Sequence, residues 1–371
     1  MDAAPAIPVL HLINGEFYAG AERVQDLLAL ELPAQGFAVS FACLKEGVFA
    51  TRRRCQDAPL HLLPMKSRVD LRLSLELARL VRAQNFRILH THTPRSALVG
   101  RLVAALTGVP MVHHVHSPAE RDTEQGWRNT RNALVEKFSL RGARRLITVS
   151  ASLERMLREQ GFTANRIRCI PNGVPVSECL RRSYQPGEEL TVGMIALFRP
   201  RKGIEVLLQA MAQLQGAGAR VRLHAVGPFE TPEYQRSVLE LTRRLGLESS
   251  VTWTGFRTDM GAEFRQMHLF ALPSLYGEGM PMVVLEAMAA GLPVVSTLVE
   301  GIPEVVRDGR DGLLAQADDP TGLAAALLRF VRGEVDAAAM GDSGRQRQRD
   351  NFSDKSMASG VAAVYRELLP P

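Results

Sequence analysis

Cysteine, aromatic residues and long apolar runs are all scarce in this sequence, and each scarcity excludes a class of protein. The four cysteines, Cys43, Cys55, Cys169 and Cys179, form no CxxC pair, so we expect no disulfide and no structural metal. Aromatic residues make up only 6% of the chain, which argues against nucleic acid as a partner. No uncharged apolar run reaches the ~18 residues of a membrane span. The first residues also lack the basic start of a signal peptide, so we expect a cytoplasmic protein.

Positive charge is concentrated in the first half of the chain. Residues 1–180 carry 24 Lys and Arg against 16 Asp and Glu, whereas residues 181–371 carry 21 against 23. A basic half suits an anionic partner, such as a lipid phosphate or the inner face of a membrane to which the protein binds peripherally. However, 40 of the 45 basic residues are Arg, and a general preference for Arg explains the excess equally well. Both explanations stay open.

Short β-branched runs alternate with helical patterns along nearly the whole chain, which is typical of α/β proteins with parallel sheets. Strands are predicted at 7–13, 37–44, 59–63, 87–91, 110–115, 144–149, 190–196, 220–226, 250–255, 269–272 and 292–296. Helical patterns lie between the strands of the first half, for example at 20–34 and 71–84, and helices are predicted in the second half at 203–215, 232–245 and 281–290. Periodicity is lost at 171–190, which is rich in Pro, Gly and charge. We therefore expect two Rossmann-like, doubly wound domains facing each other across a cleft, at 1–180 and 181–352, followed by a helix at 353–369.

The segment with the clearest chemical pattern is 272–291, LPSLYGEGMPMVVLEAMAAG. Pro281 suits the first turn of a helix, where its missing N–H is not needed. The helix N-terminus so formed would contain Gly279, Met280 and Met282, and its backbone amides favour a diphosphate. Glu286 would then lie one turn inside the helix, where its carboxylate could accept hydrogen bonds from a ribose diol. Glu278, eight residues earlier, would stand at the entrance.

This segment resembles the Glu-x7-Glu region of the family 4 retaining glycosyltransferases, whose fold is GT-B. The resemblance extends in one order over nearly the entire chain. It includes the glycine loop YAGAERV at 18–24, the interdomain turn IPNGV at 170–174, the basic phosphate loop at 197–210, a GxPEVV segment within 293–314 and a closing helix at 352–369, which in the family usually crosses back onto the first domain. Together these motifs are highly specific.

The resemblance implies roles for the second-domain residues. Glu286 would hold the donor ribose, Glu278 would lie near the transferred sugar or its phosphates, and Lys202 would stabilise the leaving diphosphate. The family usually has an Arg at the position of Leu197, so Arg199 or Arg201 would supply the second positive charge. Further substrate-binding positions implied by the resemblance are Gly227, Gly255, Phe256, Arg257, Gly279, Met280, Pro281 and Met282. Glu300 and Glu304 either contact the donor or lie on the surface.

In the first domain, His116 resembles the family histidine that lines the cleft near the transferred sugar. A metal site at VHHVHSP (112–118) is less favoured, because His113 and His114 would point to opposite faces of a strand. We expect both to be structural. His90 and His92 end another strand and are candidates to border the acceptor space. Gly15 and Gly20 either approach the acceptor closely, as the resemblance implies, or simply form a tight turn.

The implied activity is transfer of a sugar from a nucleotide-diphosphate sugar, with retention of anomeric configuration, to a glycan or lipid-linked acceptor in cell-surface polysaccharide or glycolipid synthesis. No cofactor is expected, and no metal, because the family lacks the Asp-x-Asp metal motif and none occurs here. Two alternatives stay open. One is a nucleotide-sugar epimerase or hydrolase on the same fold, and the other is a nucleotide-sugar-binding protein without catalysis.

Overall fold

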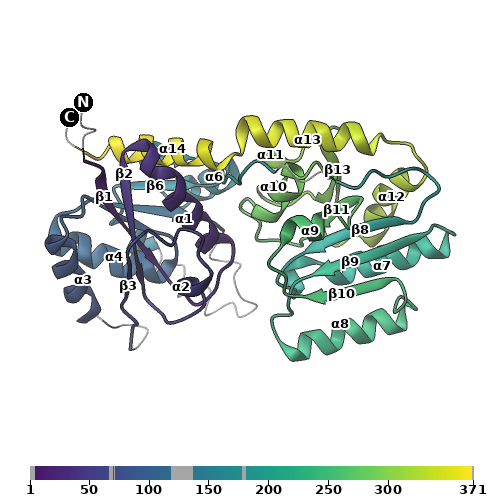
Figure 1. Cartoon of the computed structure of the whole chain (residues 1–371), viewed down its shortest axis with the longest axis horizontal. Coiled ribbons are helices and arrows are strands. Elements are labelled where there is room, and N and C mark those ends of the chain that lie inside the picture. Colours follow the sequence, from purple (N-terminus) through teal and green to yellow (C-terminus); the bar gives the residue numbers. More distant parts are fainter. Residues whose placement is uncertain (1–4, 67–69, 71, 118–136, 178–180, 370–371) are drawn as a thin grey trace. The chain divides into compact units, whose positions relative to one another are not determined.

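The computed structural model describes the chain except for residues 1–4, 67–69, 71, 118–136, 178–180 and 370–371. The chain forms two units (Figure 1). Unit 1 consists of Met1–Gly173 and Asp354–Pro371, and unit 2 of Val174–Ser353. The division therefore falls a few residues before the predicted boundary at 180, and Cys179 lies outside the described residues.

Unit 1 is built on a parallel sheet of seven strands in the order β3-β2-β1-β4-β5-β6-β7. The strands are β1 (Ile7–Ile13), β2 (Phe37–Cys43), β3 (Leu60–Leu62), β4 (Ile88–Thr91), β5 (Met111–Val115), β6 (Arg145–Thr148) and β7 (Ile167–Cys169). The chain winds outward from β1 in one direction and then, from β4, in the other. Strand β1 is thus central, and its last five residues are all buried, as expected for a parallel sheet covered on both faces.

Helices connect the strands of unit 1 and cover its sheet. They are α1 (Gly20–Glu31), η1 (Leu32–Gln35), α2 (Phe49–Arg52), α3 (Arg72–Ala83), α4 (Pro94–Thr107), α6 (Ala151–Glu159), η3 (Ala164–Arg166) and α14 (Asp354–Arg366). The last of these, α14, packs against α1 and η1 (Figure 1). The ring of Tyr365 in α14 is fully buried and lies edge-on to Phe37, with 5.1 Å between ring centroids. The carboxyl-terminal helix is thereby part of the core of unit 1.

Unit 2 contains a second parallel sheet, of six strands in the order β10-β9-β8-β11-β12-β13. Its strands are β8 (Leu190–Ile195), β9 (Val221–Val226), β10 (Val251–Gly255), β11 (Leu269–Leu272), β12 (Val294–Thr297) and β13 (Gly312–Ala315). Its helices are η4 (Pro200–Lys202), α7 (Ile204–Gly216), α8 (Pro232–Arg244), α9 (Met260–Phe264), α10 (Met282–Ala289), α11 (Ile302–Val305), α12 (Pro320–Val331) and α13 (Ala337–Asn351). The order of strands reverses between β8 and β11, which is where doubly wound sheets bind their ligands.

The prediction of two doubly wound α/β domains is confirmed, and every predicted strand is present. Strands β7 and β13 and helices α12 and α13 were not predicted. The two strands have only three and four residues, too few to establish an alternating pattern. Helix α13 is strongly polar, with the run RQRQRD near its end, so its sequence resembles a loop.

The cysteines and the lengths of the apolar helices can also be compared with the sequence predictions. Cys43, Cys55 and Cys169, the three cysteines that the structure describes, are free thiols. Among the described residues, no helix is both long and apolar enough to cross a bilayer.

Candidate functional site

The predicted donor-binding residues of unit 2 all come after the carboxyl ends of strands in one sheet. Parallel strands end at the same edge, so five separate loops meet there. Arg199, Arg201 and Lys202 follow β8; Gly227 follows β9; Gly255, Phe256 and Arg257 end or follow β10; Glu278 to Met282 follow β11; Glu300 and Glu304 follow β12. The loops after β8 and β11 flank the point where the strand order reverses.

The loop after β8 is a short turn that places Lys202 beside the next strand end. Residues Pro200–Lys202 form a 3₁₀ turn, and Gly203 reverses the chain with φ +69° before α7 begins. A Cβ atom on Gly203 would lie 2.0 Å from the carbonyl oxygen of Pro273. The backbone of this turn is therefore pressed against the end of β11, and glycine is required because it has no side chain and tolerates positive φ.

The Glu278 carboxylate is the centre of the contacts at this edge. The Lys202 ammonium donates to Glu278 Oε1, and the Ser274 hydroxyl donates to the same oxygen at 2.7 Å. The Arg201 guanidinium lies 3.8 Å from that oxygen and donates to the carbonyl of Gly277 at 3.0 Å. Only 5% of the Glu278 side chain is exposed, against 15% for Lys202 and 19% for Arg201. One buried carboxylate is thus enclosed by two cations.

These contacts determine the protonation of Glu278. Burial by itself raises the pKa of the carboxyl, but the charges of Lys202 and Arg201 and the hydrogen bonds from Lys202 and Ser274 outweigh it. The net pKa is lower than the ordinary value, so Glu278 is ionised at neutral pH. Burial lowers the pKa of the Lys202 ammonium, and attraction to Glu278 offsets this only in part.

Glu300 supports the loop that carries Glu278. Its carboxylate accepts hydrogen bonds from the backbone N–H groups of Gly277 and Glu278, at 3.0 and 3.2 Å. Gly301 N–H in turn donates to the carbonyl of Glu278 at 2.9 Å. Glu300 itself has φ +29°, an uncommon conformation for a residue with a side chain. These contacts fix the backbone around Glu278 from the side of β12.

Helix α10 begins one residue later than predicted. Pro281 is the N-cap in an extended conformation, and it supplies no capping side chain. Gly279 and Met280 precede it, and Met282 is the first helical residue. Glu286 lies one turn inside the helix and is half-buried. The amino end of α10 therefore leads out of the same loop that holds Glu278, as the sequence predicts.

The structure distinguishes the two arginines proposed to replace the missing Arg at Leu197. Arg201 lies near Glu278, as described above. The Arg199 guanidinium instead pairs with the carboxylate of Glu230, at 3.0 Å. Arg201 therefore lies 3.8 Å from Glu278, whereas Arg199, paired with Glu230, acts on Lys202 through its charge and lowers the pKa of that ammonium.

The loops after β9 and β10 are joined through their glycines. Gly227 N–H donates to the carbonyl of Gly255 at 2.8 Å, and both residues have positive φ, +128° and +67°. A Cβ atom on Gly227 would lie 1.9 Å from the carbonyl oxygen of Ala196. Phe256 is 49% exposed, and Arg257 lies 3.5 Å from Glu263. This edge of the unit 2 sheet therefore has the exposed ring of Phe256 next to the closely packed backbone of Gly227 and Gly255.

The two glycines predicted to bind substrate in unit 1, Gly15 and Gly20, differ in whether the fold requires glycine at that position. Gly15 follows β1 with φ +84°, and a Cβ atom there would lie 2.9 Å from the sulfur of Cys43. Gly20 is the first residue of α1, has no positive φ, and a Cβ atom there would meet nothing within 4 Å. Gly15 is needed by the turn itself, whereas the fold places no such demand on Gly20.

Four of the predicted histidines of unit 1, His90, His92, His114 and His116, lie in one cluster, which is buried except for the partly exposed His116. His92 Nδ1 and His116 Nε2 are 3.0 Å apart, and His114 stacks on His116 with 4.4 Å between ring centroids. His113 points elsewhere and hydrogen-bonds the Thr91 hydroxyl at 2.8 Å. Burial lowers the pKa of His116 to about 3, so its ring is neutral at physiological pH.

Two further members of this cluster, His11 and Tyr365, were not predicted from the sequence. The Tyr365 hydroxyl lies 3.0 Å from His11 Nε2 and 2.6 Å from His90 Nδ1. The available signal for His11 was a polar residue inside the strongly apolar run 7–13. Tyr365 comes from the far end of the chain, so only the three-dimensional structure brings it to these histidines.

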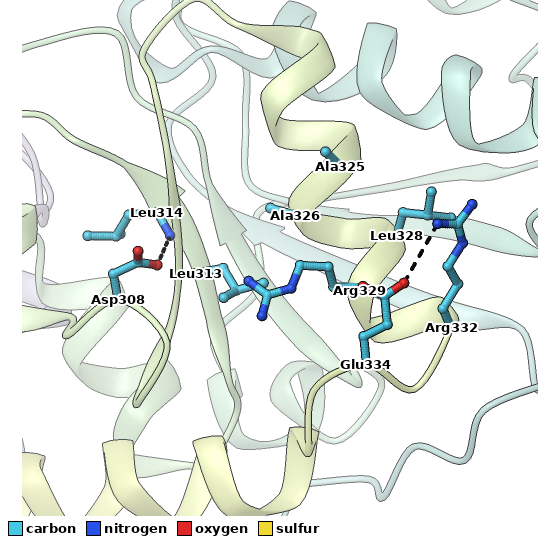
Figure 2. A pocket seen from close by; sticks show the side chains of 9 residues that line it. All are labelled: Asp308, Leu313, Leu314, Ala325, Ala326, Leu328, Arg329, Arg332 and Glu334. Carbon is cyan, nitrogen blue, oxygen red and sulfur yellow. Dashed lines mark hydrogen bonds and ion pairs between the residues drawn. The ribbon is translucent and has the colours of Figure 1, made fainter.

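A separate hollow in unit 2 lies apart from all the predicted residues. Figure 2 shows it between β13 and α12, where Asp308 accepts a hydrogen bond from Leu314 N–H at 2.9 Å. Arg332 pairs there with Glu334 at 3.6 Å (Figure 2). Asp308, Arg332 and Glu334 thus have partners among the lining residues, and none of the predicted site residues lines this hollow.

Two protein-family models match the chain, one in each unit. The model described as Glycosyltransferase Family 4 matches residues 18–178, and the model described as Glycosyl transferases group 1 matches residues 189–332. The first stretch contains the sheet of unit 1 from α1 onward, and the second contains the sheet of unit 2.

Individual glycosyltransferases are also similar in sequence to this chain. The chain is 30% identical over 223 residues to the putative colanic acid biosynthesis glycosyltransferase WcaL of Salmonella typhimurium, a match that covers 57% of this chain and 54% of WcaL. The chain thus spans about half the length of that relative. It is 28% identical over 356 residues to the D-inositol 3-phosphate glycosyltransferase of Acidothermus cellulolyticus, covering 86% of this chain and 77% of the relative.

Solved structures support the fold. Anabaena HepE, in complex with UDP and glucose, is similar with a TM-score of 0.85 and 21% identity, covering 97% of this chain and all of the HepE chain. At this identity the likeness concerns the fold, which is GT-B with its two parallel-sheet units. The two family models, matched in order along the two units, together with the glycosyltransferase relatives, support a family 4 glycosyltransferase.

Proposed function

We propose that this protein transfers a sugar from a nucleotide-diphosphate sugar to a glycan or lipid-linked acceptor, with retention of anomeric configuration and without a metal cofactor. The observation that carries the proposal is the Lys202–Glu278–Arg201 cluster at the point where the strand order of unit 2 reverses. Such edges bind nucleotides and phosphates. The curated relatives with glycosyltransferase names support the transfer of a sugar.

The cluster supplies cations where negative charge would grow. When the glycosidic bond of the donor breaks, charge accumulates on the leaving diphosphate. Lys202 and the backbone amides at the amino end of α10 would stabilise that charge. Glu278 would hold the Lys202 ammonium in place rather than act as a base, because its carboxylate is already engaged by Lys202 and Ser274. Glu286, half-buried in α10, would accept hydrogen bonds from the donor ribose.

Retention would follow from displacement on one face of the sugar. The departing diphosphate oxygen takes the proton of the acceptor hydroxyl, and that hydroxyl attacks the face from which the diphosphate leaves. The protein positions both substrates and stabilises charge. Unit 1 would bind the acceptor near Gly15, Gly20 and His116. The neutral ring of His116 is suited to hydrogen-bond a sugar hydroxyl.

The activity can be tested by binding and then by transfer. UDP-, GDP- and ADP-sugars, beginning with UDP-glucose, are added to wild type and to Glu286→Ala while thermal unfolding is followed. A donor at about 100 times its dissociation constant should add roughly 2.7 kcal/mol of stability. We expect one nucleotide class to stabilise wild type and not Glu286→Ala. A matched control is Glu233→Gln, which alters an exposed carboxylate of α8 and should respond as wild type does.

Transfer is measured with the donor so identified and a panel of lipid-linked and free glycans. NMR of the product anomeric proton reports whether configuration is retained. Donor turnover without acceptor would favour a hydrolase or epimerase. Stabilisation by a donor with no turnover under any condition would favour a binding protein without catalysis. An inverted product would contradict the proposed mechanism.

A further inference from the structure

Three buried histidines of unit 1 come together near the carboxyl ends of two neighbouring strands, β1 and β4. His11 in β1 is paired in register with His90 in β4, and His92 follows β4 directly. The ring centroids of His90 and His92 are 4.1 Å apart, and those of His11 lie 4.7 and 5.2 Å from them. One ring nitrogen from each of the three lies within 4.8 Å of the other two. All three side chains are at least 96% buried.

Each of these three rings has one nitrogen held by a neighbour and one left over. Tyr365 holds His11 Nε2 and His90 Nδ1, and His116 holds His92 Nδ1. The remaining nitrogens, His11 Nδ1, His90 Nε2 and His92 Nε2, are buried and have no hydrogen-bond partner among the described residues. Buried polar atoms without partners are uncommon in folded proteins and require an explanation.

We propose that these three nitrogens bind a first-row divalent transition metal of the Zn²⁺ type. Neutral imidazole is a preferred ligand of such ions. Ligating histidines are also typically held by a hydrogen bond to their other ring nitrogen, which fixes ring orientation and tautomer. All three histidines have that bond. Tyr365 can accept from both His11 and His90, because a hydroxyl oxygen has two lone pairs.

The spacing of His11, His90 and His92 is compatible with a bound metal ion. Zn–N bonds of about 2.0–2.1 Å in a tetrahedral site put ligand nitrogens about 3.3 Å apart. Each of the three histidines has a ring nitrogen within 4.8 Å of one on each of the other two, so a movement of the rings would bring ligand nitrogens to that spacing. His114 lies beside these rings and is a candidate fourth ligand, although the group of ring nitrogens within 4.8 Å that contains it is formed with His92 and His116. Neither of its nitrogens has a partner among the described residues, and its ring centroid lies 5.3 Å from that of His92.

This site goes beyond the proposed function and does not depend on it. All its ligands come from unit 1, and it differs from the site considered at 112–118, since only His114 is shared. The metal would join β1 to β4 and, through Tyr365, would stabilise the packing of α14. The competing explanation is a buried water, which needs two to four polar partners and would leave no metal in the purified protein.

The test uses the full-length protein without a histidine tag. It is stripped with a chelator, reloaded with Zn²⁺ or Co²⁺ at micromolar concentration, desalted and assayed by elemental analysis. We expect one equivalent per chain, a tetrahedral Co²⁺ absorption spectrum and a higher melting temperature with metal. His90→Asn should lose the stoichiometric metal. His224→Asn, which alters a histidine of unit 2 bound to Glu263, should keep it.

Tyr365→Phe gives a second test that preserves the packed ring. Loss of the hydroxyl that holds two ligands should weaken metal binding about 10- to 100-fold, while circular dichroism remains that of wild type. If His90→Asn does not fold, His92→Gln and Tyr365→Phe decide. The proposal is overturned if wild type binds metal only at millimolar concentration, if metal leaves its melting temperature unchanged, or if the cluster variants bind as much as His224→Asn.

Discussion

The Lys202 ammonium and the Glu278 carboxylate form a direct ion pair although 75 residues separate them in the chain. Each follows a different strand of the unit 2 sheet, and the two strands are neighbours at the point where the strand order reverses. The pair joins a positive group suited to phosphate with the carboxylate that opens the Glu-x7-Glu motif. Four of the five predictions below concern this edge of the sheet.

Replacement of the Lys202 ammonium should slow transfer more than it weakens binding. In Lys202→Met the charge on the leaving diphosphate would lose its closest cation, and kcat should fall by about 100-fold or more. Steady-state kinetics with the identified donor measure the effect. Lys355→Met, at an exposed position in α14, is the matched control and should retain wild-type kcat. Equal rates in the two variants would contradict the role of Lys202.

The same pair should make stability depend on pH in the acid range. The pKa of Glu278 in the folded protein is below its ordinary value of 4.5. A group whose pKa is depressed on folding stabilises the protein above its unfolded pKa, and this contribution is lost as pH falls through the folded pKa. Glu278→Gln should therefore show a smaller loss of unfolding free energy below pH 4.5 than wild type.

Denaturant titrations of both proteins from pH 6 to pH 3 measure this difference. At neutral pH, removing only Lys202 should cost about 3–5 kcal/mol because the buried carboxylate is left without its partner. The double variant Lys202→Met, Glu278→Gln should lose less than the sum of the single variants. Strict additivity would mean that the pair is not coupled.

Arg201 and Arg199 should differ in their effect on activity. Arg201 lies 3.8 Å from Glu278, whereas Arg199 pairs with the partly exposed Glu230. Arg201→Gln should lower kcat by about tenfold or more, because it removes positive charge from the cluster. Arg199→Gln removes a surface pair worth at most about 1 kcal/mol and should leave kcat within twofold of wild type. A larger effect at Arg199 would reverse the assignment.

Gly203 should tolerate no side chain. Alanine there would adopt a left-handed conformation and place its Cβ atom against the carbonyl of Pro273, so Gly203→Ala should lose at least about 2 kcal/mol. Gly216→Ala is the control. Gly216 is the last residue of α7, and a Cβ atom there would meet nothing within 4 Å. Alanine at this position should therefore stabilise the helix by about 0.5–1 kcal/mol. Urea unfolding measures both.

Substitution of Gly20 should distinguish a role in acceptor binding from a role in folding. Gly20→Ala adds a methyl group with no neighbour within 4 Å, so the melting temperature should not fall. If the acceptor approaches this residue closely, its KM should rise by about tenfold while donor binding is unchanged. Gly15→Ala is the contrast. It should unfold at lower temperature, because Gly15 has φ +84° and lies against Cys43. An unchanged acceptor KM in Gly20→Ala would leave Gly20 as part of the turn only.

Sequence predicted the fold and the places where site loops begin, but not which side chains meet. The strand runs are apolar and the loops rich in Gly and Pro, and these patterns depend on local composition. The contacts depend on sheet order. His11 faces His90 only because β1 pairs with β4. Likewise Arg201, inside the 3₁₀ turn at Pro200–Lys202, lies 3.8 Å from Glu278, whereas Arg199, the extended residue before the turn, pairs with Glu230.

The chain leaves unit 1 after Gly173 and returns to it at Asp354, and this has a consequence for synthesis on the ribosome. Val174 N–H donates to the carbonyl of Phe352 at 2.9 Å, so the first and last residues of unit 2 lie side by side. Unit 2 can therefore fold without any later segment of the chain. Unit 1 differs, because the ring of Tyr365, which is made after all of unit 2, fills its core beside Phe37. Unit 1 can therefore complete its core only after the whole of unit 2 has been synthesised. A chain that ends at Ser353 would contain every residue of unit 2 but would leave the core of unit 1 open.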